Sequence, residues 1–171
     1  SWSGWTEDAR EEPRWQKCKD PSVIYHQNRF IMYYACSLAK HRNSCIAVAS
    51  SDNLIDWEDE GPIITAPWID DPLVGPAGFE EPRIVQRNGK FYIFVKYFWG
   101  TQYAISDDPY HFGSFRVMGP WHTSNIFQDD KRWYISHVSH NVGKAMIRST
   151  QNRRKPLRGL YLAGLVWAGD Y

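Results

Sequence analysis

Short apolar segments alternate with polar turns along the chain, and helical periodicity is nearly absent. A representative stretch runs through Val23–Ile24, Phe30–Tyr34 and Cys45–Ala49, with polar residues between these segments. Apolar runs of this length, bounded by Asp, Asn, Gly and Pro, are typical of β-strands. The pattern therefore predicts an all-β domain.

The strand pattern also repeats along the chain. Pro21 and Pro82 are 61 residues apart, and so are Phe30 and Phe91, so strand order and turn chemistry recur together. A looser third unit follows, in which Trp133 stands 42 residues after Phe91. Four strands in about 40–50 residues is the size of a propeller blade. The alternative is a β-sandwich whose hairpins resemble each other by chance.

We expect one partial β-propeller domain over residues 1–171, with blades at roughly 15–65, 78–120 and 121–168. The Pro-, Gly- and Asp-rich loop Thr65–Phe79 accounts for the longer first interval. The strands expected in the third blade are Ser124–Phe127, Trp133–Ser136, Gly143–Ile147 and Gly159–Ala163.

Three blades do not close a ring, because propellers have about four to eight. The sheet faces left exposed would be rich in Trp and Tyr, and such surfaces associate. We therefore expect either a homo-oligomer or a longer chain whose remainder completes the propeller.

Composition narrows the choice of partners. The chain has 171 residues, with 20 Lys and Arg against 19 Asp and Glu, so its net charge of +1 gives no reason to expect nucleic acid. Apolar runs such as Phe30–Cys36 are too short to span a bilayer, so no membrane partner is expected either. The three cysteines lack zinc spacing, although one disulfide could form. The compartment stays open.

Acidic residues precede proline at the start of both clear blades, as Asp20-Pro21 and Glu80-Glu81-Pro82. The first strand of a propeller blade is innermost, so its N-terminal end faces the central funnel. Carboxylates from neighbouring blades would then converge there. Cleavage of a glycosidic bond needs such a pair, one protonated and one ionised.

These motifs resemble those of the five-bladed β-propeller glycosidases of families 32 and 43. Lys19-Asp20-Pro21 is similar to their Arg-Asp-Pro motif, and Glu80-Glu81-Pro82 to their Glu-Cys-Pro or Glu-Gly-Pro motif. Ser50–Glu58 and Ser106–Phe112 are similar to their Ser-x-Asp strand-and-turn segments. The resemblance implies action on furanosides such as fructosides or arabinosides. It implies a substrate-orienting Asp20 and a general acid at Glu80, while the repeat alignment pairs Glu81 with Asp20 and makes Glu81 the alternative.

The chain departs from that family in the number of acids. No Asp motif of the first-blade type precedes Lys19, and Asn125 stands at the opening of the third blade, where a Glu would be expected if Asp20 were the first-blade acid. Two of the three acids are therefore present. This leaves a non-catalytic carbohydrate-binding or assembly propeller, or a related glycoside phosphorylase, as alternatives.

Further candidates for binding carbohydrate are loop tryptophans, whose flat faces stack on sugars, two histidines and one arginine. They are Trp68, Trp99, Trp121, His122, His137 and Arg83. No cofactor motif is present, and a structural metal ion in the axial channel has no support in the sequence.

Overall fold

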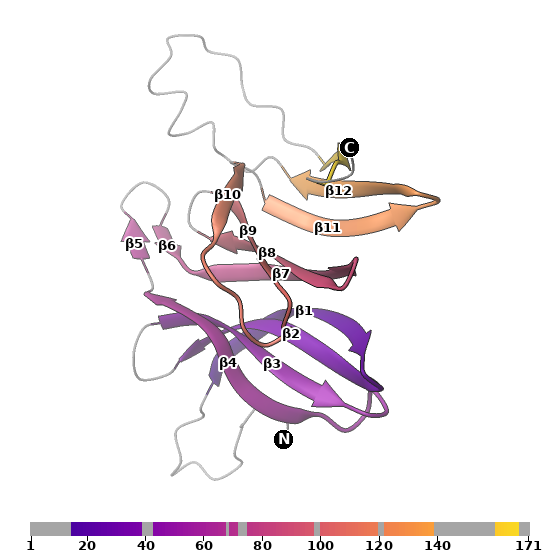
Figure 1. The fold of residues 1–171 in the computed structure, drawn as a ribbon. Helices are drawn as coiled ribbons and strands as arrows, with labels where there is room; N and C mark the ends of the chain where they lie inside the picture. The colour runs from indigo at the N-terminus through magenta and orange to yellow at the C-terminus, as the bar shows by residue number, and fades with distance from the viewer. Residues whose placement is uncertain are drawn as a thin grey trace, which may run out of the picture.

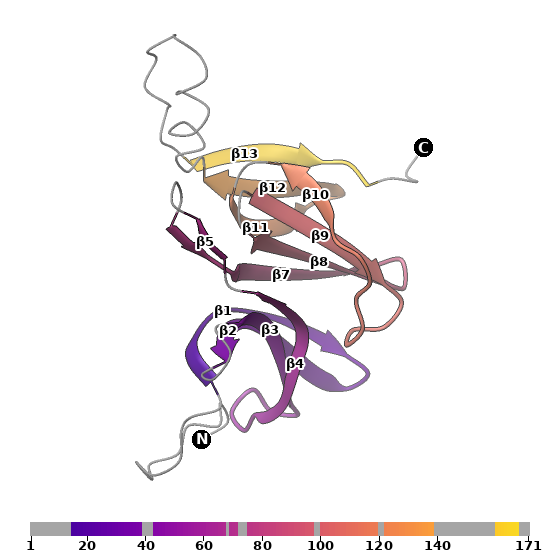
Figure 2. The ribbon, with the colours of Figure 1, turned by 90° about the vertical axis from the view of Figure 1, so that its left-hand side faces the viewer.

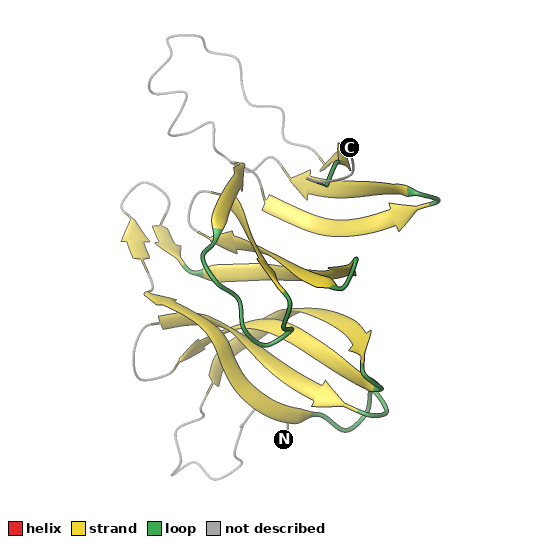
Figure 3. Cartoon of the chain, viewed as in Figure 1, coloured by secondary structure: helices red, strands yellow, loops and turns green. Residues whose placement is uncertain are grey.

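The described part of the chain consists of strands and turns, and none of its residues is helical (Figure 3). This computed structural model describes residues 15–38, 43–67, 69–71, 75–97, 100–119, 122–138 and 160–167. Their strands form three larger antiparallel sheets and one two-stranded sheet (Figure 1). The predicted all-β class is confirmed.

The first two sheets contain four strands each, hydrogen-bonded in the order in which they follow along the chain. Blade 1 consists of β1 (Trp15–His26), β2 (Arg29–Leu38), β3 (Asn43–Ser51) and β4 (Glu58–Pro67). Blade 2 consists of β7 (Phe79–Arg87), β8 (Lys90–Tyr97), β9 (Gly100–Ser106) and β10 (Arg116–Gly119). Between them, within the expected loop, β5 (Ile69–Asp71) pairs with β6 (Gly75–Ala77).

The third sheet, blade 3, has the described strands β11 (His122–Asp129), β12 (Arg132–Val138) and β13 (Leu160–Leu165), in that order. The segment expected as a fourth strand is therefore third in the sheet. It pairs directly with β12, Tyr134 opposite Gly164, because an edge strand offers its free N–H and C=O groups to any strand that reaches it. The strand expected at Gly143–Ile147 lies outside the described residues.

The blades stack so that their first strands are neighbours. β1 and β2 contact β7, and β11 contacts β7 and β8. Figures 1 and 2 show blade 2 between blade 1 and blade 3. This side-by-side placement of first strands is the one that brings residues at equivalent positions of the repeat together.

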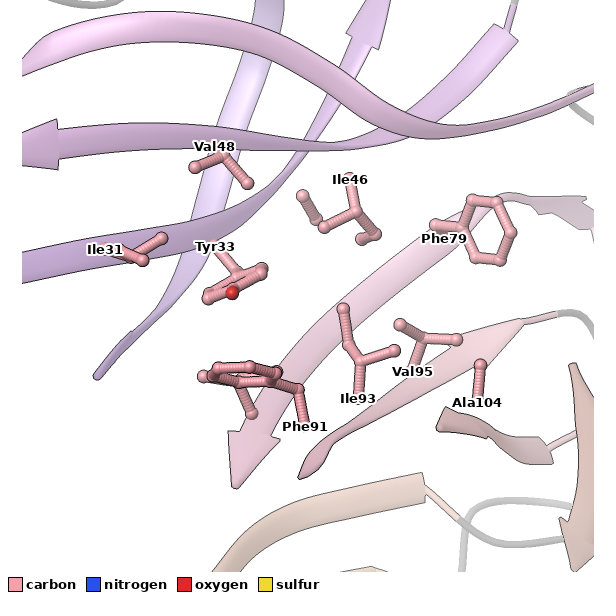
Figure 4. Close-up of a cluster of buried hydrophobic side chains, with 11 residues drawn as sticks. Ile31, Tyr33, Ile46, Val48, Phe79, Phe91, Ile93, Val95 and Ala104 are labelled. Atoms are coloured by element: carbon pink, nitrogen blue, oxygen red, sulfur yellow. The ribbon is translucent and has the colours of Figure 1, made fainter. Parts of the chain in front are cut away.

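A continuous apolar core joins blades 1 and 2. Residues alternate between the two faces of a strand, so Ile31 and Tyr33 of β2 face blade 2 and meet Phe91 and Ile93 of β8 (Figure 4). The hydroxyl of Tyr33 also donates a 2.9 Å hydrogen bond to the carbonyl of Pro109 in blade 2. The two blades are therefore packed into one body.

The other face of β8 packs against blade 3. Phe94 lies in a second cluster with Ile126, Ile135 and Trp167, all of them buried. Because β8 has buried residues on both faces, its sequence is a nearly continuous apolar run, Phe91–Val95.

The Ser-x-Asp segments form matched turns after the third strand of each blade. In blade 1, Ser51 Oγ accepts hydrogen bonds from the amides of Asn53 and Leu54, and Asn53 Oδ1 accepts from the amide of Asp56 at 2.8 Å. In blade 2, Ser106 Oγ accepts from the amide of Asp108 in the same way. In both Ser-x-Asp segments these hydrogen bonds hold the turn that follows the third strand.

Because the described residues form no helix, none of them belongs to a membrane-spanning helix.

Candidate active site at the start of two blades

Asp20 and Glu81 occupy equivalent bulges in neighbouring first strands. Both have left-handed backbones, with φ of 59° and 52°, and each sits in a register shift against the second strand of its blade. Pro21 or Pro82 follows each of them, and a residue without an N–H suits a bulge, where ladder pairing is interrupted. The 61-residue repeat therefore reproduces an unusual backbone geometry as well as a residue pattern.

Hydrogen bonds between the blades bring these two bulges together. The backbone amide of Glu81 donates to Asp20 Oδ2 at 3.2 Å. On either side, the amide of Ile84 donates to Ser22 Oγ at 3.2 Å and the amide of Phe79 to Ser44 Oγ at 2.8 Å. Side chains of blade 1 thus hold the start of β7, which carries Glu80 and Glu81.

Glu80 is held by two lysines, one from each blade. Lys19 Nζ lies 2.5 Å from its Oε1, and Lys96, opposite Glu80 on β8, binds its Oε2. Burial alone would raise the pKa of Glu80, but the hydrogen bonds from Lys19 and Lys96 outweigh burial and lower that pKa. Glu80 is therefore ionised in this arrangement.

Glu81 has the opposite environment. Its Oε2 is buried and has no hydrogen-bond partner among the described residues. Burial raises the pKa of Glu81, and the charges of Asp20 and Glu80 raise it further, while Lys96 and Arg83 act against the shift. A carboxyl group with a raised pKa beside an ionised one is the arrangement that acid catalysis uses.

Basic residues surround the three acids. The pKa of Lys19 is raised because its ion pair with Glu80 and the nearby acids outweigh its burial. Arg83 Nη1 donates to the carbonyl of Pro82 at 2.8 Å. Lys96 was not among the residues predicted from the sequence. Counting from the Arg87–Lys90 hairpin would place Tyr97 opposite Glu80, but the bulge shifts the pairing by one residue and places Lys96 there.

In blade 3, Thr123 holds the position of Asp20 and Glu81. Each of these three residues stands six places before the end of its strand, and a register shift follows Thr123 as well. Asn125, which was expected at the position of a third acid, instead matches Ser22 and Arg83. The described residues of blade 3 thus supply no carboxylate at this position.

The other residues predicted to bind carbohydrate are two histidines of blade 3 and three loop tryptophans. His122 is the first residue of β11 and matches Lys19 and Glu80 by position, while His137 lies opposite Thr123 on β12. Trp68, Trp99 and Trp121 lie outside the described residues. Of the other tryptophans, Trp167 is buried, and Trp57 and Trp133 pack against core clusters.

Within the described segments, no group of three or more His, Cys, Asp or Glu side chains is arranged to hold a metal ion. A cavity does lie between blades 2 and 3, lined by residues that include Arg87, Gln128, Trp133 and Trp167. It is at the hairpin end of β7, about 20 Å along the strand from Glu81, so it is separate from the acids.

Comparisons with known proteins agree with this architecture. The sequence matches no protein-family model and no curated protein. Among solved structures, a β-xylosidase aligns with a TM-score of 0.57 at 16% identity, covering 87% of this chain and 55% of its own. A Bombyx mori family-32 β-fructofuranosidase aligns with a TM-score of 0.53 at 16% identity, over 71% of this chain and 29% of its own. The Bacillus subtilis arabinanase Arb43A aligns with a TM-score of 0.50 at 17% identity, over 69% of this chain and 43% of its own.

The chain has the β-propeller fold of these glycosidases. The fold resemblance expected from the sequence is confirmed. The chain spans less than two thirds of the length of each of these structures, from 29% to 55%. At 16–17% identity the likeness is one of fold.

Proposed function

We propose that this propeller acts on furanosides, such as fructosides or arabinosides, by carboxylate acid–base chemistry. The observation that carries the proposal is the junction of blades 1 and 2, where the backbone amide of Glu81 donates a 3.2 Å hydrogen bond to Asp20 and Lys19 lies beside both Asp20 and Glu80. Solved structures of the same fold include a β-fructofuranosidase and an arabinanase, which supports this substrate class.

In this scheme Asp20 binds sugar hydroxyls as a hydrogen-bond acceptor. One of its oxygens, Oδ2, is occupied by the Glu81 amide, so the other is left for substrate. Its side chain is 28% exposed, which leaves room for a ligand to reach it.

The proton donor is one of the two adjacent glutamates. The motif position favours Glu80, but both of its oxygens bind lysines, and a general acid must hold a proton at working pH. Glu81 has the raised pKa and a buried oxygen without a partner. We therefore assign proton donation to the leaving oxygen to Glu81. Glu80 is the alternative, and matched Glu80→Gln and Glu81→Gln variants distinguish the two.

The third acid would come from outside the described blades, either from a second copy of this chain or from another segment of polypeptide. The presence of Thr123 at the position that aligns with Asp20 and Glu81 supports this requirement. The assembled propeller, rather than the three blades alone, would then be the active species.

A non-catalytic carbohydrate-binding propeller is the second candidate, and the same Thr123 favours it. Native mass spectrometry combined with turnover assays separates the two. Wild type is assayed on aryl fructofuranosides and arabinofuranosides in each assembly state, beside Asp20→Asn. Turnover confined to the assembled species and lost in Asp20→Asn supports catalysis. Sugar binding without turnover in every assembly state would replace catalysis with binding.

A further inference from the structure

All three cysteines of the chain lie together on blade 1, on the face of β2 opposite the one that packs on blade 2. Cys36 of β2 and Cys45 of β3 are buried there in a cluster that also contains Met32, Tyr34, Ala47 and Ala49. Cys18 of β1 packs against the same cluster and is partly buried. The candidate active site uses none of the three.

Cys36 and Cys45 are directly opposite each other in the antiparallel pairing of β2 and β3. Their Sγ atoms lie 2.6 Å apart, so both side chains point toward each other on one face of the sheet. Directly opposite residues of an antiparallel pair have Cα atoms about 4.5–5.5 Å apart. This separation is within the range that a disulfide bridges, about 4.4–6.8 Å.

We propose that Cys36 and Cys45 form a disulfide across β2 and β3, leaving Cys18 as a free thiol. A small-molecule disulfide such as oxidised glutathione supplies the oxidising equivalents. One cysteine thiolate attacks it, forms a mixed disulfide and releases one glutathione thiol. The other cysteine then attacks the protein sulfur of the mixed disulfide, closes the Cys36–Cys45 bond and releases the second glutathione thiol.

Burial sets when this bond forms and how long it lasts. The two residues are only 3% and 0% exposed. The hydrogen bond with Cys45 and burial both raise the pKa of Cys36, which disfavours its reactive thiolate in the folded blade. The bond therefore closes while blade 1 assembles, and afterwards it resists reductants that do not unfold the protein.

The cross-link would also stiffen the support of the candidate site. Cys45 follows Ser44, whose Oγ binds the amide of Phe79, the residue before Glu80. Fixing β3 at Cys45 would hold Ser44, and through it the start of β7, in place.

The test is to refold the full chain with reduced and oxidised glutathione, then alkylate it under denaturing conditions without further reductant. We expect one alkyl adduct in the intact mass, on Cys18, and three adducts when reductant is added first. Peptide mapping is expected to find the 36–45 linkage. Three adducts without reductant, or a bond that includes Cys18, would overturn the proposal.

Variants extend the test to stability. Oxidised wild type is expected to melt about 5 °C or more above reduced wild type, because a cross-link restricts the unfolded chain. Cys18→Ser is expected to keep this difference, while Cys36→Ser and Cys45→Ser are expected to lose it. An equal redox-dependent difference in Cys36→Ser would contradict the assignment. The wild-type mass measurement decides the question even if a variant fails to fold.

Discussion

Asp20 Oδ2 accepts a 3.2 Å hydrogen bond from the backbone amide of Glu81, which occupies the equivalent bulge of the next blade. The repeat therefore places two acidic residues in contact, and the side chain of Asp20 supports the bulge at Glu81. Because a left-handed residue before proline does not satisfy its amide within the strand ladder, an acceptor from the adjacent blade stabilises it.

The first prediction separates the acceptor role of Asp20 from its charge. Asp20→Ala leaves the Glu81 amide without its acceptor and should lower the free energy of unfolding by about 1 kcal/mol. Asp20→Asn keeps an acceptor oxygen and should stay close to wild type in stability, while losing turnover. Urea unfolding and activity assays check the two effects. Equal destabilisation by Ala and Asn would show that the charge, rather than the hydrogen bond, stabilises the junction.

The second prediction concerns Glu80, which Lys19 and Lys96 hold in the ionised form. Its lowered pKa in the folded protein means that Glu80 adds stability above its unfolded-state pKa, and that this stability is lost as pH falls through the folded-state pKa. Glu80→Gln should lower the free energy of unfolding at pH 7 by about 2 kcal/mol. The difference from wild type should shrink toward acidic pH. A loss that is the same at pH 7 and pH 3 would contradict the ion-pair assignment.

The third prediction is the matched variant at the neighbouring position. The pKa of Glu81 is raised in the folded protein, so its ionisation disfavours folding above the unfolded-state pKa. Glu81→Gln should therefore be neutral or stabilising at pH 7, and any gain should vanish below about pH 4, where both states are protonated. Chemical denaturation across this pH range measures the effect. Clear destabilisation by Glu81→Gln at pH 7 would show that its carboxylate is well partnered.

The fourth prediction tests the packing of blade 2 on blade 1. Ile93 is fully buried in the shared core, so Ile93→Ala should lower the free energy of unfolding by about 3 kcal/mol. Val117, which is 77% exposed on β10, is the matched control, and Val117→Ala should change stability by less than about 0.5 kcal/mol. Similar losses in the two variants would mean that the blades do not share this core in solution.

The sequence was informative wherever structure depends on local signals. The equal spacings of Pro21 to Pro82 and of Phe30 to Phe91 predicted the blade repeat and the contact between the acidic segments. These spacings work because the hairpins after β1 and β7 are of equal length, so residues at the same distance from each hairpin occupy the same level of neighbouring sheets.

Features that depend on longer-range pairing were not predicted. The place of β13 next to β12 depends on which strand reaches a free edge, and residue spacing does not encode that. The ion pair of Glu80 with Lys96 depends on a bulge that shifts the register by one residue. The contrast between Glu80 and Glu81 depends on burial and neighbouring charges, which adjacent letters of one sequence do not reveal.

The central claim is that one carboxyl group at the junction of blades 1 and 2 donates a proton to the leaving oxygen of a furanoside. Leaving-group dependence tests it most directly, because a 2,4-dinitrophenolate departs without protonation while an alkoxide does not. In the assembled protein, Glu81→Gln should lose turnover of an alkyl furanoside by at least about 100-fold and keep most of its turnover of the 2,4-dinitrophenyl furanoside. Glu80→Gln should affect both substrates alike. Equal losses on both substrates in Glu81→Gln, or the selective loss in Glu80→Gln instead, would contradict the assignment.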